Sequence, residues 1–176
     1  MKYIALLRGI NVSGQRRITM EALTKMFVEL NLNSVQTYLQ SGNVVFQANE
    51  IDSKRLEHRI SFSIEENFGI DVPALVLSAD TLKSIVENCP FEKSKEAMLY
   101  ITFLFDTPNS IDKQSIECRK SANEEIVFFE KAVYFYCPNG YGRTKLNNNF
   151  LENFLKVKAT TRNWRTVNEL LRIALL

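Results

Sequence analysis

The feature that most limits how this chain can fold is the order of its strand-like and helix-like segments. Residues 3–7 are apolar and predict a strand, and residues 19–30 place their apolar side chains on one face of a helix. Residues 34–48 predict two short strands joined by a tight turn, residues 56–68 repeat apolar side chains every four positions as a helix does, and residues 72–78 predict another strand. The first half therefore has the order β-α-β-β-α-β.

The second half repeats this order after a linking helix expected at residues 80–88. Strands are predicted at 98–105, 125–130, 132–137 and 158–163, and helices at 111–120, 147–156 and 166–174. This is the split β-α-β, or ferredoxin-like, order twice over. We therefore predict an α+β fold with two subdomains, residues 1–78 and residues 79–176, the second of which adds the linking helix and a C-terminal helix.

Burial should be extensive in a chain of 176 residues with 45% hydrophobic content. The stretches "YIALL" and "ALVLS" are apolar at consecutive positions, which predicts that both faces of these strands are covered and favours joined sheets over an isolated two-layer unit. Trp164 and the three cysteines are expected to be buried. The predicted core also includes Leu6, Leu23, Phe27, Val45, Leu56, Ile60, Ile101, Phe103, Phe154 and Leu170.

Several classes of protein are excluded by what the sequence lacks. No run approaches the roughly 18 apolar residues of a membrane span, so we expect a cytoplasmic protein without a membrane partner. The sequence contains one histidine, His58, and three widely spaced cysteines. This number and spacing predict neither a zinc site nor a disulfide framework. "GYGRTK" lacks the spacing of a phosphate-binding P-loop. The residues therefore assign no catalytic group, no metal and no cofactor, and they leave open whether the protein is an enzyme.

Polar loops follow the first two predicted strands. In a β-α-β-β-α-β unit these strands point the same way, so their carboxyl ends share one edge of the sheet. The two loops are "RGINVSGQRR" and "QSGN". The side chains expected to crowd this edge are Arg8, Asn11, Arg16, Arg17, Gln40, Ser41 and Asn43.

The second half places a similar set of residues at the opposite edge of its sheet, by the same argument. The loop after its third strand is "PNGYGRTKLN", and its fourth strand ends in "TTRNW". The side chains expected there are Arg143, Lys145, Thr161, Arg162, Asn163 and Trp164, beside a helix start near Thr144 or Asn147.

Charge gathers in the same two regions. Residues 8–17 hold three arginines and no acid, and residues 141–168 hold six basic side chains against one glutamate, so together they carry +8. Because the whole chain carries +2, the remainder carries −6. Glycines, arginines and helix starts favour an anion, since backbone N–H groups and the helix dipole add to the side-chain charge. The alternative is structural, because Arg and Asn beside strand ends often bind only carbonyl groups.

Four motifs identify a resemblance to a known family. "ALLRGINVSG", "TYLQSGNVVF", "RTKLNNNFLE" and "ATTRNWRTV" fall in the order and at about the spacing of the family catalogued as domain of unknown function 1697, across nearly the whole chain. The resemblance implies a cytosolic, mainly bacterial protein with a duplicated ferredoxin-like fold. It transfers no activity, cofactor or site residue to this chain.

Three functions are compatible with these observations. The leading hypothesis is a pocket for a phosphate-bearing or carboxylate-bearing small molecule, in a cleft where the two basic edges approach each other. The second is a nucleic-acid-binding module that stacks bases on Tyr134 and Tyr136, which share one face of a predicted strand. The third is a scaffold whose loops only hold the two subdomains together.

Overall fold

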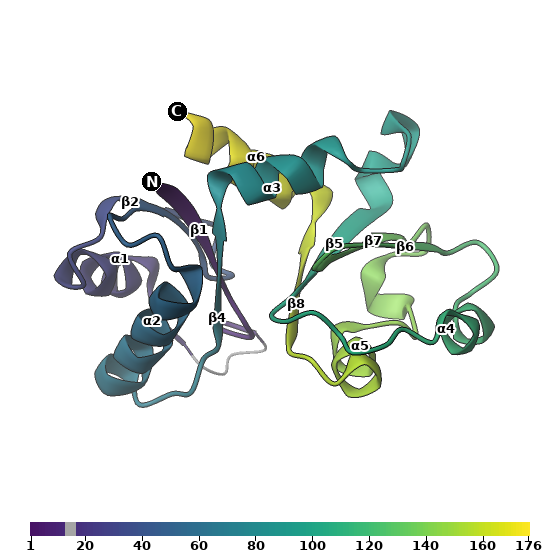
Figure 1. The fold of residues 1–176 in the computed structure, drawn as a ribbon, viewed down its shortest axis with the longest axis horizontal. Coiled ribbons are helices and arrows are strands. Elements are labelled where there is room, and N and C mark those ends of the chain that lie inside the picture. The colour runs from purple at the N-terminus through teal and green to yellow at the C-terminus, as the bar shows by residue number, and fades with distance from the viewer. Residues whose placement is uncertain (13–16) are drawn as a thin grey trace. The chain divides into compact units, whose positions relative to one another are not determined.

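The computed structural model describes residues 1–12 and 17–176. Figure 1 shows the element order. The first half contains β1 (Lys2–Leu7), α1 (Met20–Glu29), β2 (Asn33–Tyr38), β3 (Asn43–Gln47), α2 (Ser53–Phe68) and β4 (Ala74–Ser78). The remainder contains α3 (Ala79–Glu87), η1 (Lys93–Met98), β5 (Leu99–Leu104), α4 (Lys113–Arg119), β6 (Glu125–Phe129), β7 (Ala132–Tyr136), η2 (Tyr141–Arg143), α5 (Asn148–Leu155), β8 (Ala159–Asn163) and α6 (Trp164–Leu175). Every strand and α-helix expected from the sequence is present.

The strands form two sheets with the same topology. The orders are β2-β3-β1-β4 and β6-β7-β5-β8, and all neighbouring strands are antiparallel. The predicted duplicated ferredoxin-like α+β fold is confirmed. Both faces of β1 and β4 are buried, as predicted, and the described strands form two four-stranded sheets.

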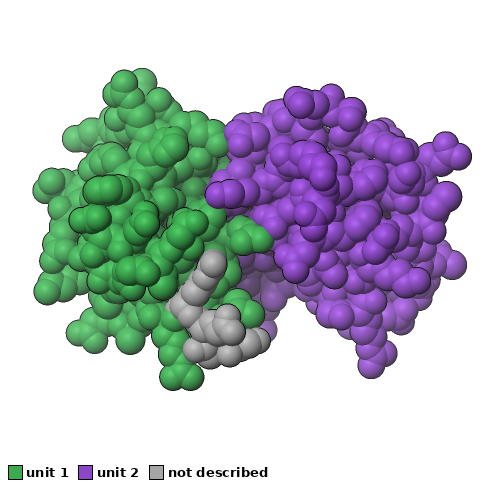
Figure 2. All heavy atoms as spheres, turned by 90° about the horizontal axis from the view of Figure 1, so that it is seen from below, with its two compact units in different colours: residues 1–84, 169–176 green, residues 85–168 purple. Residues whose placement is uncertain are grey.

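The chain divides into two compact units (Figure 2). Unit 1 contains residues 1–84 and 169–176, and unit 2 contains residues 85–168. In unit 1, α1 and α2 pack on one face of the sheet, where the ring of Phe27 meets that of Phe46 edge to face at 5.5 Å. In unit 2, α4 and α5 lie on one face of the other sheet and bury Ile116 and Leu151 (Figure 1).

The predicted core is confirmed with one exception. Phe154 is only partly buried, because Leu151 and Leu155 are the residues that α5 places in the core of unit 2. Trp164 is buried, as expected. No helix within the described residues is long and apolar enough to cross a membrane.

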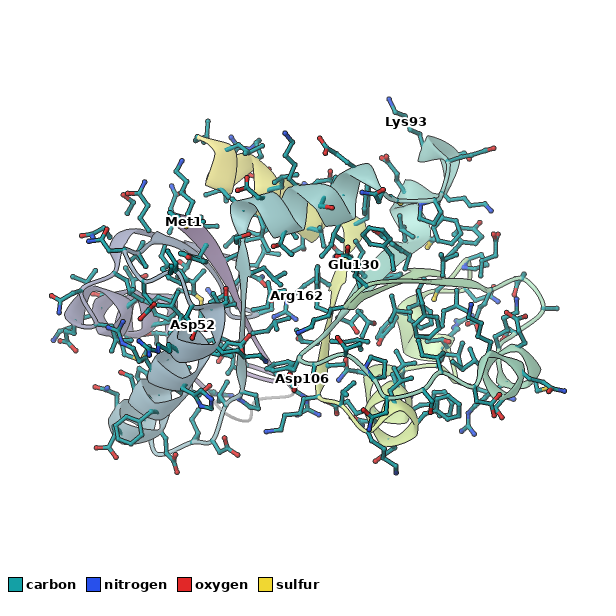
Figure 3. The ribbon with its side chains drawn as sticks, in the orientation of Figure 1. Met1, Asp52, Lys93, Asp106, Glu130 and Arg162 are labelled. Atoms are coloured by element: carbon teal, nitrogen blue, oxygen red, sulfur yellow. The ribbon has the colours of Figure 1, made fainter. Side chains whose placement is uncertain are left out.

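Polar side chains fix where the helices begin and end. The Thr19 hydroxyl accepts a hydrogen bond from the N–H of Ala22 at 3.2 Å and caps α1. Asp52 caps α2 in the same way (Figure 3), and Gly69 ends that helix in the left-handed conformation with φ +66°. Asn147 caps α5 by accepting from the N–H of Phe150.

Helix side chains also accept hydrogen bonds from backbone N–H groups on the outer edges of two edge strands, β4 and β8. Along β4, the N–H of Val76 donates to Glu57 at 3.1 Å and the N–H of Ala74 donates to the Ser61 hydroxyl at 3.0 Å. Along β8, the N–H of Ala159 donates to Glu152 at 2.8 Å. These donors lie outside the strand ladders, so the side chains supply partners that the sheet does not.

Gly42 is a position where the backbone has no room for a side chain. Its φ is +70°, and a Cβ atom there would lie 2.7 Å from Leu7 Cβ and 2.8 Å from Ile10 Cδ1. We expect Gly42→Ala to lower the free energy of unfolding by about 2–5 kcal/mol, the sum of left-handed strain and overpacking. Gly69 is the matched control, because it has φ +66° and, among the described residues, nothing beyond its own chain neighbours lies within 4 Å of such a Cβ. Gly69→Ala should cost only about 1–2 kcal/mol in urea unfolding, and equal losses would contradict the packing argument.

Phe27 tests the core of unit 1. The side chain is fully buried, so Phe27→Ala should lower the free energy of unfolding by about 3–5 kcal/mol. Phe62 is the control, because it lies on α2 with 65% of its surface exposed. Phe62→Ala should change the free energy of unfolding by less than about 0.5 kcal/mol. Denaturant midpoints measure both, and an unchanged midpoint for Phe27→Ala would mean that α1 does not pack against the sheet.

Candidate functional site

The carboxyl ends of β1 and β2 share one edge of the unit 1 sheet, as predicted. Asn43, the first residue of β3, is paired with Leu6 near the end of β1 and with Tyr38 at the end of β2. We call the loops at this edge the first rim, which consists of residues 8–12, 17–18 and 39–43. Residues 13–16, and with them the predicted site residue Arg16, lie outside the described part of the chain.

Asn11 joins the two loops of the first rim. Its Nδ2 donates to the carbonyl oxygens of Ile18 at 2.9 Å and Gln40 at 2.8 Å. Its Oδ1 accepts from the N–H of Ile18 at 2.9 Å. One side-chain amide therefore holds the approach to α1 and the β2–β3 turn together. The prediction that Asn11 and Asn43 lie at the same end of their sheet is confirmed.

Asn43 shapes the turn from inside. The residue is fully buried, and its Nδ2 donates to the Tyr38 carbonyl oxygen at 3.0 Å and to the Ser41 hydroxyl at 2.9 Å. These bonds fix the backbone that carries Gln40 and Ser41, both of which are exposed. Asn43 thus positions the surface of the first rim without being on it.

The backbone of the first rim adopts a conformation that most residues avoid. Gly9, Asn11, Leu39 and Gly42 all have positive φ, between 55° and 73°. Leu39 is a leucine in this conformation and leaves 55% of its surface exposed, while Val12 leaves 60% exposed. Such backbone persists only where the surrounding contacts impose it, and it is found often at binding sites. The rim therefore presents exposed apolar groups on constrained loops.

Two described cations belong to the first rim. Arg8 is half-buried, and its backbone N–H donates to the Pro73 carbonyl oxygen at 3.0 Å, which fixes the start of the loop. Arg17 is exposed and stands two residues before Thr19, the cap of α1. Positive charge, hydroxyl and amide donors and a helix start therefore lie on neighbouring segments.

The second predicted edge also exists in unit 2. Tyr136 at the end of β7 pairs with Leu99, and Asn163 at the end of β8 pairs with Tyr100. The side chains there make internal hydrogen bonds. Thr161 Oγ1 lies 2.8 Å from Thr102 Oγ1, 3.0 Å from the Tyr141 hydroxyl and 3.2 Å from Asn148 Oδ1. Asn163 Oδ1 accepts from the N–H of Thr166 at 2.8 Å and so caps α6.

Arg162 extends from β8 (Figure 3). Its Nη1 donates to Thr160 Oγ1 at 2.7 Å and to the Thr161 carbonyl oxygen at 2.9 Å. Burial lowers the pKa of its guanidinium to about 10, because removal from water disfavours the charged form. The guanidinium remains charged at neutral pH.

Lys145 is the one predicted site residue that lines a described groove. It lines a groove between α4 and α5, which we call the α4–α5 groove, together with Ser115, Cys118, Arg119, Phe150 and Phe154. Arg143, in η2, is exposed. Sequence reasoning missed this groove. The available signal was that α5 carries four apolar residues in eight, of which only Leu151 and Leu155 are buried in the core.

Tyr134 and Tyr136 do not form an exposed stacking surface. Tyr134 is fully buried and its hydroxyl donates to the Ile85 carbonyl oxygen at 2.6 Å. Tyr136 is half-buried, with its ring 6.4 Å from that of Phe91 and 5.0 Å from Lys95 Nζ. The arrangement that favoured base stacking is therefore not present at these two residues.

The three thiols differ, and the expectation that all are buried is wrong for two of them. Cys137 is buried, Cys89 is half-buried and Cys118 is exposed. Cys118 faces outward because α4 turns Ile116, two residues earlier, into the core. Burial raises the pKa of Cys137 to about 12 and also raises that of Cys89. Among the described residues, no three His, Cys, Asp or Glu side chains gather as metal ligands.

Comparison with known proteins establishes the family and the fold. No curated protein matches the chain. A solved structure of a conserved bacterial protein, SP0830 from Streptococcus pneumoniae, is similar with a TM-score of 0.76 and 21% identity over 98% of each chain. At that identity the likeness shows the fold alone. The model of the family described as "Protein of unknown function (DUF1697)" matches residues 1–134, and the chain belongs to this family.

Thiol reactivity checks the placement of the cysteines. Because burial raises the pKa of Cys137 to about 12, its thiol stays protonated at pH 8, so it should not react with an aromatic disulfide reagent in the folded protein. Cys118 should react first, and Cys118→Ser should remove the fast phase. Rapid reaction of all three thiols before unfolding would contradict this pattern of burial.

Proposed function

We propose that, in this member of the family, the first rim binds the anionic group, a phosphate or a carboxylate, of a small molecule. The observation that carries the proposal is the set of three hydrogen bonds made by Asn11, which hold an arginine-bearing loop against the β2–β3 turn and the approach to α1. A loop fixed before the ligand arrives loses little conformational freedom on binding.

The groups on this loop have the chemistry that an anion needs. Arg17 is exposed beside the start of α1, and Ser41 is exposed on the turn that Asn43 fixes. An arginine forms paired hydrogen bonds with a carboxylate or phosphate, and a helix start adds a favourable dipole. Val12 and Leu39 offer apolar contacts for the rest of the molecule.

The predicted site residues of unit 2 are less suited to ligand binding than those of the first rim. The side-chain oxygens of Thr161 and Asn163 already hold β8, η2 and the start of α6, so we assign them no ligand contact. Ligand binding by Arg143 and Arg162 stays a prediction. The proposal is one of binding alone and includes no bond-making step.

A titration with inorganic phosphate, followed by backbone amide chemical shifts, tests the first rim. We expect shifts in residues 8–12, 17–20 and 39–43. Arg17→Met should weaken phosphate binding about fivefold, the upper range for an exposed ion pair, and higher salt should weaken it further.

Lys25→Met is the matched control, because Lys25 is an exposed cation on α1 of the same unit. It should leave the phosphate affinity unchanged. Equal affinities for Arg17→Met and Lys25→Met, or phosphate shifts confined to other loops, would leave the first rim with a purely structural role.

A further inference from the structure

We propose that the α4–α5 groove of unit 2 is a second binding site, for a small aromatic carboxylate. The groove has a volume of about 610 Å³, within the roughly 300–1,000 Å³ of sites that hold small molecules. α4 and α5 lie on the same face of the unit 2 sheet (Figure 1). The site is independent of the first rim, which belongs to unit 1.

The α5 side of the groove is aromatic. Phe150 and Phe154 are four residues apart and therefore on the same side of the helix, with ring centres 5.3 Å apart and planes inclined by 21°. Both rings are only partly buried against the core of unit 2, so each keeps surface in the groove. An aromatic ligand can add to this pair by offset or edge-to-face packing.

The charged residues that line the groove, Arg119 and Lys145, are both cations, and the nearest acid bonded to a lining residue is Asp112, which accepts from Ser115 at 2.6 Å. The Arg119 guanidinium lies 4.4 Å from the centre of the Phe150 ring, which restrains the long side chain while leaving donors for a ligand. Within the described part of the chain, neither Arg119 nor Lys145 forms an ion pair, and Glu117 on α4 pairs with Lys120 at 2.8 Å. The residues that line the groove include no Asp or Glu.

These features together select an aromatic anion. A carboxylate accepts two parallel hydrogen bonds from a guanidinium, and Lys145 adds a second charge at the groove. A neutral ring would use only Phe150 and Phe154, and an inorganic anion would use only the cations. The ligand that uses both has a planar apolar body and one carboxylate.

The probe is 1-naphthoate, and binding is measured by calorimetry and by its protection of Cys118 from a maleimide reagent. Cys118 lines the groove and is exposed, so a bound ligand should slow its labelling. We expect Arg119→Gln and Lys145→Gln each to weaken naphthoate binding about threefold to tenfold, because each removes a surface charge that faces the carboxylate.

Lys131→Gln is the control, since Lys131 is an exposed lysine of unit 2 outside the groove. It should bind naphthoate as the parent does. Protection of Cys118 reports on the groove alone, which keeps this test separate from that of the first rim. The uncharged analogue 1-naphthalenemethanol should bind more weakly than naphthoate. Equal binding of the two compounds, unchanged affinity in Arg119→Gln and Lys145→Gln, or unprotected Cys118 at saturating naphthoate would each overturn the proposal.

Discussion

The loops of the first rim are held together by the side-chain amide of Asn11, which acts only through hydrogen bonds. Asn11 uses both its donor and its acceptor, so that Ile18 and Gln40 are held by the same group. This arrangement needs the β2–β3 turn to lie very close to the end of β1, and Gly42 permits that approach because it has no Cβ. The leucine and isoleucine around Gly42 therefore determine, through packing, where the polar groups of the rim can be.

The order of elements could be predicted because the apolar period changes sharply from strand to helix along the chain. The edge shared by Asn11 and Asn43 followed from the direction of the strands alone. Hydrogen bonds between residues distant in sequence could not be predicted in this way. Thr161, for example, meets Thr102 across a strand ladder and Tyr141 from the loop before α5. The Thr161 hydroxyl therefore bonds to residues that are 59 and 20 positions away, which hydrophobic periodicity and turn motifs do not predict.

The two units have the same topology but use it with different chemistry. In unit 1, exposed polar and apolar groups collect on the loops at the carboxyl ends of β1 and β2. In unit 2, the corresponding argument identified the correct edge, yet Asn163 caps a helix there and Lys145 belongs to a groove between helices. Sheet topology fixes which loops are neighbours, and the side chains decide what those loops do.

The hydrogen bonds from the outer edges of β4 and β8 to helix side chains affect which further strands can pair with these edges. A strand edge with unpaired N–H groups is a template on which a strand of another molecule can add, and repeated addition produces fibres. Glu57 and Glu152 occupy those donors with carboxylates, so an incoming strand would have to displace a charged acceptor before it could pair. We therefore expect the two glutamates that attach α2 and α5 to their sheets to oppose the pairing of a foreign strand at Val76 and Ala159.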